Sequence, residues 1–291
     1  MNERWRQNFG WSKTRQARWD ECRRAYYYHY IAVYGGCPDA PFSELKRLAR
    51  LDRFSHWQGR LIHQAISTQI ARFAAGLEPD PKSAKSYLLR EVEHVQGEPR
   101  SVLAEAENGV QLEAERFEAL KTNGLKQLNH FFEKIWPRYR DLTYLEHEKL
   151  GRFSMDGLKI LVKTDLVMKE PKGSLLIADW KTGDEPQDPD ESLQLGAYIL
   201  WATQKYQLLP EEISAELVYL QTAEIKSTQR SREQLDEIRE HIRARAREMW
   251  AVKNLTDLPA TPEESKCKEC SFATCCPQGK SFLTRRELTP F

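Results

Sequence analysis

SLLIADWKTG, residues 174–183, joins an apolar run to an acid and a lysine, Asp179 and Lys181. The apolar run predicts a buried strand, in which successive side chains point to opposite faces. Asp179 and Lys181 then share one face, and Trp180 points to the other. A carboxylate and an ammonium at the end of a buried strand indicate either a salt bridge or a site of chemistry.

The segments around this strand predict an α/β or α+β fold, because helical and two-residue periods occupy separate parts of the chain. Three apolar segments separated by turn residues predict a three-strand meander, which is followed by a helix and a further strand. The expected strands span residues 143–150, 158–169, 174–182 and 215–222. The expected helices span residues 12–34, 56–76, 83–136 with a break near 97–99, 190–206 and 231–252.

Length and composition exclude several classes of protein. The 291 residues carry a balanced formal charge of +1, so the net charge gives no indication of partners. No apolar run approaches the ~18 residues that span a bilayer, and the polar N-terminus predicts a cytoplasmic protein without a membrane partner. The sequence contains no Walker loop of the form GxxxxGK[ST], so it carries no P-loop motor.

Asp165 lies on the preceding expected strand, and we expect it beside Asp179 because these two strands form a hairpin that turns at Pro171–Gly173. Two close carboxylates repel each other unless a cation lies between them, and hard oxygen ligands suit Mg²⁺ or Mn²⁺. The Trp180 carbonyl can add a ligand, and Lys181 can orient a water or stabilise charge on a phosphate. The arrangement fits metal-assisted hydrolysis of a phosphodiester. The alternative is a simple Asp179–Lys181 salt bridge, with Asp165 as a turn residue.

These residues, together with two further motifs, resemble the RecB-like branch of the PD-(D/E)xK nuclease superfamily. The motifs are Gly59-Arg-Leu-Ile-His63 on an early helix and Gln194-Leu-Gly-Ala-Tyr198 on the helix after the strand. The resemblance implies a restriction-endonuclease-like core and a catalytic Lys181. It implies metal ligation by His63, Asp165, Asp179 and the Trp180 carbonyl, with Gln194 and Tyr198 lining the site from one helix face.

Two alternatives and one departure accompany this resemblance. His63 lies near an apolar helix face, where a hydrogen-bonded core histidine is the alternative to a ligand. Val162 stands where the family often has glycine, a departure that touches no ligand. Glu146 and Glu148 share a face of the first expected strand, so either can add a ligand; the alternative is a solvated strand edge.

Four of the six cysteines form a further pattern: Cys267-x2-Cys270-x5-Cys276 lies near the C-terminus, and Cys22 lies far upstream in RWDECRRAYYYHYI. In a cytosolic chain this clustering indicates metal or redox chemistry rather than disulfides. Four thiolates suit a [4Fe–4S] cluster or Zn²⁺. The layout resembles that of family members with iron–sulfur clusters, although Arg23 replaces their proline. Cys275 is an alternative to Cys276.

The resemblance therefore implies a single nuclease domain over residues 1–291. Its parts are the two segments 1–34 and 255–291, which the iron–sulfur cluster would link, a helical region at 56–140 that carries His63, and a catalytic core at 141–254. The implied function is that of a divalent-metal-dependent DNA exonuclease acting on single strands or ends. The setting would be repair, recombination, CRISPR adaptation or phage defence, with a helicase or other partner in trans.

Two alternatives concern DNA binding. The first is a non-catalytic DNA-binding scaffold that keeps a nuclease fold. The second concerns the N-terminal segment 4–28, where cations and aromatics alternate: these aromatics either stack bases or form a helix core. Helices within 83–136 can form a cap over the active site.

Overall fold

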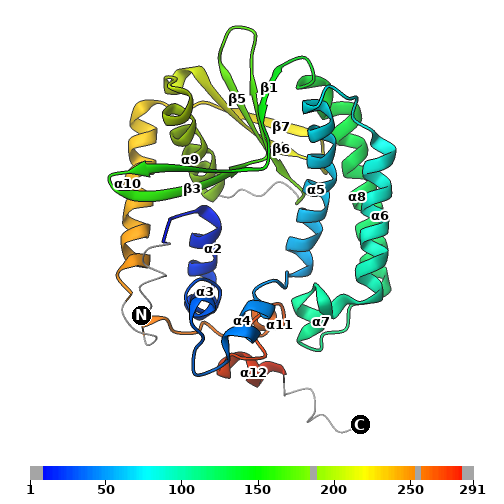
Figure 1. The fold of residues 1–291 in the computed structure, drawn as a ribbon, viewed down its shortest axis with the longest axis vertical. Helices are drawn as coiled ribbons and strands as arrows, with labels where there is room; N and C mark the ends of the chain where they lie inside the picture. The colour runs from blue at the N-terminus through cyan, green and yellow to red at the C-terminus, as the bar shows by residue number, and fades with distance from the viewer. Residues whose placement is uncertain (1–8, 184–188, 253–256, 284–291) are drawn as a thin grey trace.

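The computed structural model describes residues 9–183, 189–252 and 257–283, and its centre is a mixed five-stranded sheet (Figure 1). The strand order is β1-β4-β5-β6-β7. β5 and β6 pair in parallel, and every other neighbouring pair of this sheet is antiparallel. The strands are β1 (Thr143–Glu146), β4 (Leu166–Lys169), β5 (Leu175–Lys181), β6 (Ile213–Tyr219) and β7 (Glu224–Thr228).

A two-stranded hairpin, β2 (Lys149–Met155) and β3 (Leu158–Thr164), projects from this sheet across α9 and α10 (Figure 1). Its two-residue turn, Asp156 and Gly157, has positive φ at both positions (49° and 79°), which matches the right-handed twist of the strands. β3 continues into β4 through Asp165, so the hairpin and the central sheet meet at that residue.

Helices cover both faces of the central sheet (Figure 1). One face carries α9 (Pro189–Tyr206) and α10 (Arg232–Trp250), and the other carries α5 (Phe54–Ala74), α6 (Pro81–Gly97) and α8 (Ala114–His130). β5 alternates between the two cores: Ile177 packs with the α9 side, and Trp180 packs on the α5 side against Phe131, with ring centroids 5.4 Å apart. The side chain of Asp179 therefore faces α9.

A third group of helices lies below the sheet in Figure 1, where the first and the last described helices come together. Its small core contains Tyr28, Leu45 and Phe272. The Thr261 hydroxyl donates to the Glu21 carbonyl oxygen at 2.9 Å, which ties the C-terminal segment to the N-terminal one. The helices of this group are α2 (Lys13–Glu21), α3 (Arg23–Tyr30), α4 (Phe42–Leu48), α7 (Ala104–Glu107), α11 (Glu264–Lys268) and α12 (Pro277–Leu283).

The mixed α/β fold is confirmed, and β1, β4 and β5 pair antiparallel in the expected order. The expected strands 143–150 and 158–169 are each divided, however, and residues 149–155 and 158–164 form the separate hairpin β2–β3. The element boundaries differ where the backbone changes conformation. The expected helix 12–34 is interrupted at Cys22, which is extended (φ −160°, ψ 111°). The expected helix 83–136 is divided by turns between α6, α7 and α8. Short 3₁₀ segments cover Ala32–Tyr34, Pro99–Ser101, Trp136–Arg138 and Pro210–Glu212, and a π-helical turn covers Phe131–Ile135.

Four described aromatic side chains of the N-terminal segment form core, so base stacking by these four is the wrong interpretation; Trp5 lies outside the described residues. Trp11, Trp19, Tyr26 and Tyr28 are each at most 2% exposed. Trp19 and Tyr26 pack edge to face, with ring centroids 5.2 Å apart. In the part of the chain that the structure describes, no helix is both long and apolar enough to cross a bilayer.

Candidate active site

A cavity of about 830 Å³ opens where β5 ends, beside α5, α9 and the start of α2. Every residue that the sequence places in the site lines this one cavity, although the contributing segments lie far apart in the chain. These residues are His63, Asp165, Asp179, Trp180, Lys181, Gln194 and Tyr198.

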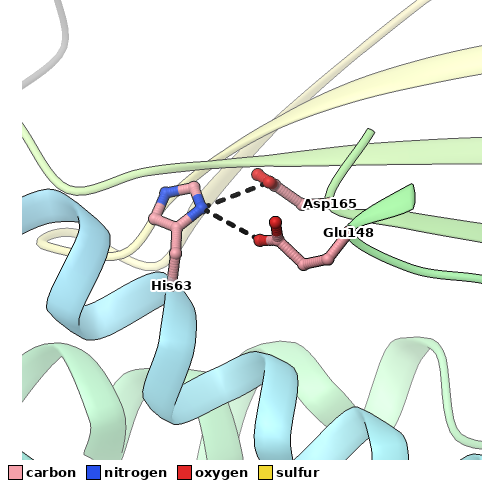
Figure 2. A group of neighbouring side chains, drawn as sticks. All are labelled: His63, Glu148 and Asp165. Atoms are coloured by element: carbon pink, nitrogen blue, oxygen red, sulfur yellow. Dashed lines mark hydrogen bonds and ion pairs between the residues drawn. The ribbon is translucent and has the colours of Figure 1, made fainter. Parts of the chain in front are cut away.

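Three of the side chains in this cavity converge on one point (Figure 2). His63 Nδ1 lies 3.2 Å from Asp165 Oδ1 and 3.7 Å from Glu148 Oε1. One ligand atom from each of the three residues lies within 4.8 Å of the others, and no other group of this kind occurs among the described residues. A nitrogen and two carboxylates at this spacing can hold a divalent cation.

Glu148 belongs to this group because the first expected strand is broken. Glu148 lies between β1 and β2 with φ at 49°, in the left-handed region that a non-glycine residue rarely adopts. Its carboxylate pairs with Lys163 as well as with His63. Glu146, the other candidate, is directed elsewhere: it accepts a 2.7 Å hydrogen bond from the Tyr206 hydroxyl and pairs with Lys205.

A second network surrounds Asp179 on the α9 side of the cavity. Lys181 Nζ lies 2.8 Å from Asp179 Oδ2 and donates to Gln194 Oε1 at 2.8 Å. Gln194 Nε2 donates to Asp179 Oδ1 at 3.1 Å. The Tyr198 hydroxyl lies 2.8 Å from Asp179 Oδ1 and 2.9 Å from the Lys163 carbonyl oxygen, and its single proton serves one of them at a time. The network fixes the orientation of both Asp179 and Lys181.

Trp180 joins the two groups through its backbone. Its N–H donates to Asp165 Oδ2 at 2.7 Å, which leaves Asp165 Oδ1 directed at His63. The indole ring is buried on the opposite face of β5. Ligation by the Trp180 carbonyl stays a prediction.

The pKa values of His63 and Asp165 are both raised, for different reasons. Burial alone would lower the pKa of His63, but the Asp165 and Glu148 carboxylates outweigh it and raise that pKa. Burial raises the pKa of Asp165 against the opposing effect of His63, and Asp179 adds to the rise. The four neighbouring ionisable groups are His63, Glu148, Asp165 and Asp179. Together they retain a proton that a bound cation would displace.

Two exposed cations line this cavity, each paired with a carboxylate, while two buried carboxylates lie deeper in it. Lys163 and Arg60 line it with side chains that are 58% and 61% exposed, whereas Asp165 and Asp179 are buried. The buried carboxylates attract a metal ion, and the exposed cations attract phosphates. This division of charge fits a phosphodiester substrate.

A second, small cavity in the group of helices below the sheet brings together the four cysteines that the sequence singled out. Cys22, Cys267, Cys270 and Cys276 line it. Cys275 does not: its thiol donates to the Phe272 carbonyl oxygen at 3.3 Å.

The spacing of the cysteine sulfurs distinguishes between the possible metal groups. A single tetrahedral Zn²⁺ holds its sulfurs about 3.8 Å apart, given a Zn–S bond of about 2.3 Å. Among the described residues, no three cysteine sulfurs lie within 4.8 Å of one another. In a four-iron cluster each thiolate binds a different iron, so the sulfurs stand farther apart than they do around one zinc ion.

Comparison with known proteins assigns the chain to a family. The family model of the PD-(D/E)XK nuclease superfamily matches residues 10–277. The chain matches no curated protein. Among solved structures, a candidate exonuclease from Eubacterium rectale is 12% identical, with 67% of this chain and 82% of that chain covered and a TM-score of 0.31. The protein SSO0001 is 14% identical, with 65% and 81% covered and a TM-score of 0.29.

TM-scores this low carry no argument about fold or function, whereas the family match spans most of the chain. The mixed sheet with helices on both faces is consistent with the restriction-endonuclease-like fold of that family. The chain therefore belongs to the PD-(D/E)XK nuclease superfamily.

Proposed function

We propose that this chain is a RecB-like DNA exonuclease that depends on a divalent metal, Mg²⁺ or Mn²⁺, and acts on single strands or DNA ends. The observation that carries the proposal is the convergence of two groups in one cavity. His63, Glu148 and Asp165 form a potential metal-ligand group, and Trp180 N–H joins Asp165 to the strand that carries Asp179 and Lys181.

The ligand residues that converge in the cavity have proposed roles. His63, Asp165, Asp179 and the Trp180 carbonyl are ligands, and Glu148 adds a further carboxylate. When bound, the metal supplies a more acidic water and a positive charge near the phosphate.

The side chains on the α9 side of the cavity position the reactants. The Lys181 ammonium is held by Asp179 and Gln194, so it can donate to the attacking water or to a phosphate oxygen. Gln194 and Tyr198 hold Asp179 in place.

We also propose that Cys22, Cys267, Cys270 and Cys276 hold a [4Fe–4S] cluster. Support comes from their shared cavity, from the sulfur spacing and from neighbouring cations: Arg24 lines the cavity, and Arg53 lies close enough to oppose the raised pKa of Cys270. Burial raises the pKa of Cys270 to about 11, so ligation must release protons. The cluster would link the first helices to the C-terminal segment.

A cluster role implies handling without oxygen and a partner that loads iron. The proposed setting is DNA repair, recombination, CRISPR adaptation or phage defence. Because the sequence has no P-loop, a helicase would act in trans.

The nuclease proposal is tested with protein purified without oxygen and supplied with Mn²⁺ or Mg²⁺. The substrates are end-labelled linear and circular single-stranded DNA. Linear DNA is expected to be degraded and circular DNA spared. Lys181→Ala should abolish cleavage, whereas Lys169→Ala, which changes an exposed lysine at the end of β4, should not. Metal-independent DNA binding without cleavage would instead support the scaffold alternative.

The cluster proposal is tested by metal analysis of a matched pair of variants. Cys276→Ala is expected to lose iron and acid-labile sulfide, and Cys275→Ala, at the adjacent position, is expected to keep both. Zinc without iron in the wild-type protein would replace the cluster with a zinc site.

A further inference from the structure

The β2–β3 hairpin has one face packed in the core and one face in solvent. Gly151, Phe153 and Met155 of β2 are buried, and the residues between them are exposed. A Cβ at Gly151 would lie 2.5 Å from Trp201 Nε1, which shows how closely the inner face packs on α9. The outer face is therefore exposed along the whole length of β2.

The strand register places one cation at every level of this outer face. Leu150 pairs with Lys163, Arg152 with Leu161, and Ser154 with Lys159. Successive levels are about 6.7 Å apart, because each is two residues along a strand. The three cations lie at successive levels and form a ladder about 13 Å long.

No carboxylate of the hairpin strands offsets this charge. Residues 149–155 and 158–164 contain no Asp or Glu, and the Asp156 carboxylate in the turn pairs with Arg243. Of the three cations, Lys163 pairs with Glu148 at the active-site cavity. Among the described residues, neither Arg152 nor Lys159 makes an ion pair.

The ladder connects two cavities. At one end Leu150, Leu161 and Lys163 are part of the wall of the active-site cavity. At the other end Lys159 lines a separate cavity of about 740 Å³, together with Arg247 and Trp250. Trp250 is 42% exposed. A surface that begins at the proposed metal site and ends at an aromatic side chain beside two cations has the composition of a single-strand binding path.

We propose that the outer face of the β2–β3 hairpin is a track for single-stranded nucleic acid, which leads from the active-site cavity to the Trp250 cavity. Lys163, Arg152 and Lys159 contact successive backbone phosphates, Leu150 and Leu161 contact sugars and bases, and Trp250 stacks a base at the far end. This inference rests on the proposed nuclease function for its direction, but its binding test does not depend on cleavage.

The observations favour a single strand over a duplex. The ladder is only as wide as the two strands β2 and β3, which lie about 5 Å apart. It therefore presents one row of cations rather than two. One row matches one phosphate backbone. The hydrophobic residues between the cations suit unpaired bases, which a duplex would keep stacked inside.

The test compares two double variants that change the net charge equally. Arg152→Gln with Lys159→Gln removes the two cations that lie outside the active-site cavity. Lys126→Gln with Lys134→Gln removes two exposed cations from the opposite side of the sheet, on α8 and the π-helical turn. The probe is a fluorescent twelve-nucleotide oligothymidylate, and anisotropy is measured over a series of salt concentrations with Ca²⁺ present.

Loss of two phosphate contacts should reduce the slope of log K against log salt by about 1.4, since each contact on a single strand contributes about 0.7. If the lines converge near 1 M salt, the hairpin variant binds about 25-fold more weakly at 0.1 M salt. The control double variant should keep the wild-type slope. An unchanged slope in the hairpin variant, or an equal loss in the control, would overturn the track.

A second measurement separates the track from the nuclease proposal. Cleavage of a three-nucleotide substrate, too short to reach Lys159, should be the same in the hairpin variant and the wild type, while cleavage of the twelve-nucleotide strand should slow. If the wild type cleaves neither substrate, the nuclease function fails and the salt slope still decides the track. Equal slowing on both substrates would show damage to the active site and refute the track.

Discussion

His29 gives the structure a specific dependence of stability on pH. His29 Nδ1 lies 2.9 Å from Arg18 Nη1. A guanidinium can only donate, so Nδ1 must accept, and the imidazole is neutral in the folded chain. Burial, with Arg18 and then Arg15 adding to it, lowers the pKa of His29 to about 3.

The size of the effect follows from the difference between the folded and unfolded pKa. The unfolded chain takes up a proton at His29 below about pH 6.5, whereas the folded chain does so only near pH 3. Unfolding is therefore favoured progressively as the pH falls from 6.5 towards 3. At pH 5 the loss in the free energy of unfolding is about 2 kcal/mol, from about 1.5 pH units at about 1.36 kcal/mol each.

His29→Asn isolates this contribution, because asparagine offers an acceptor near the Nδ1 position and does not titrate. Urea unfolding of both proteins is measured at pH 7 and pH 5. Between these values the wild type should lose about 2 kcal/mol more than the variant, once groups common to both cancel. Equal losses in the two proteins would refute a neutral, buried His29.

Three further substitutions have expected outcomes. Glu148→Gln should weaken Mn²⁺ binding about tenfold or more in calorimetry, because the ligand group loses an anion; unchanged affinity would remove Glu148 from the site. Tyr198→Phe should cost about 1 kcal/mol in urea unfolding and lower the cleavage rate, since Asp179 loses a donor; a wild-type rate would show that Asp179 needs no such support. Gly151→Ala should lower stability by about 1–3 kcal/mol in thermal unfolding, because its Cβ would clash with Trp201; an unchanged melting temperature would contradict this close packing.

The geometry around β5 could be predicted from the sequence, because it depends on two local periods. The two-residue period of the strand put Asp179 and Lys181 on one face, and the structure has them 2.8 Å apart. The i, i+4 spacing put Gln194 and Tyr198 on one helix face, and both reach Asp179. Local periodicity fixes side-chain direction whatever the rest of the chain does.

The position of Glu148 could not be predicted in this way. A continuous strand over 143–150 would direct Glu146 and Glu148 to the same side. The left-handed backbone at Glu148 breaks that period and sends the two carboxylates to different partners, Lys205 and His63. A single-residue change of φ leaves no trace in a pattern of apolar and polar residues.

Edge strand β7 was missed for a related reason. Its sequence, EIKST, is polar and mostly exposed, since one edge of the strand faces solvent. The aromatics of α2 and α3 could not be assigned from the sequence either. Cations alternate with aromatic residues in the sequence both where the rings bind bases at a surface and where they form a core. Only tertiary packing, such as that of Trp19 on Tyr26, decides between them.

The hydrogen bond from Thr261 to Glu21 spans 240 residues of sequence, and it has a consequence for the life of the protein in the cell. A ribosome releases the chain from the N-terminus onward, so Tyr28 and Leu45 can pack with Phe272 only after residue 272 has been synthesised. A prematurely terminated chain lacks this partner and leaves those side chains in water, where proteases and chaperones recognise them. The group of helices below the sheet thereby makes synthesis through Phe272 a condition for escaping degradation.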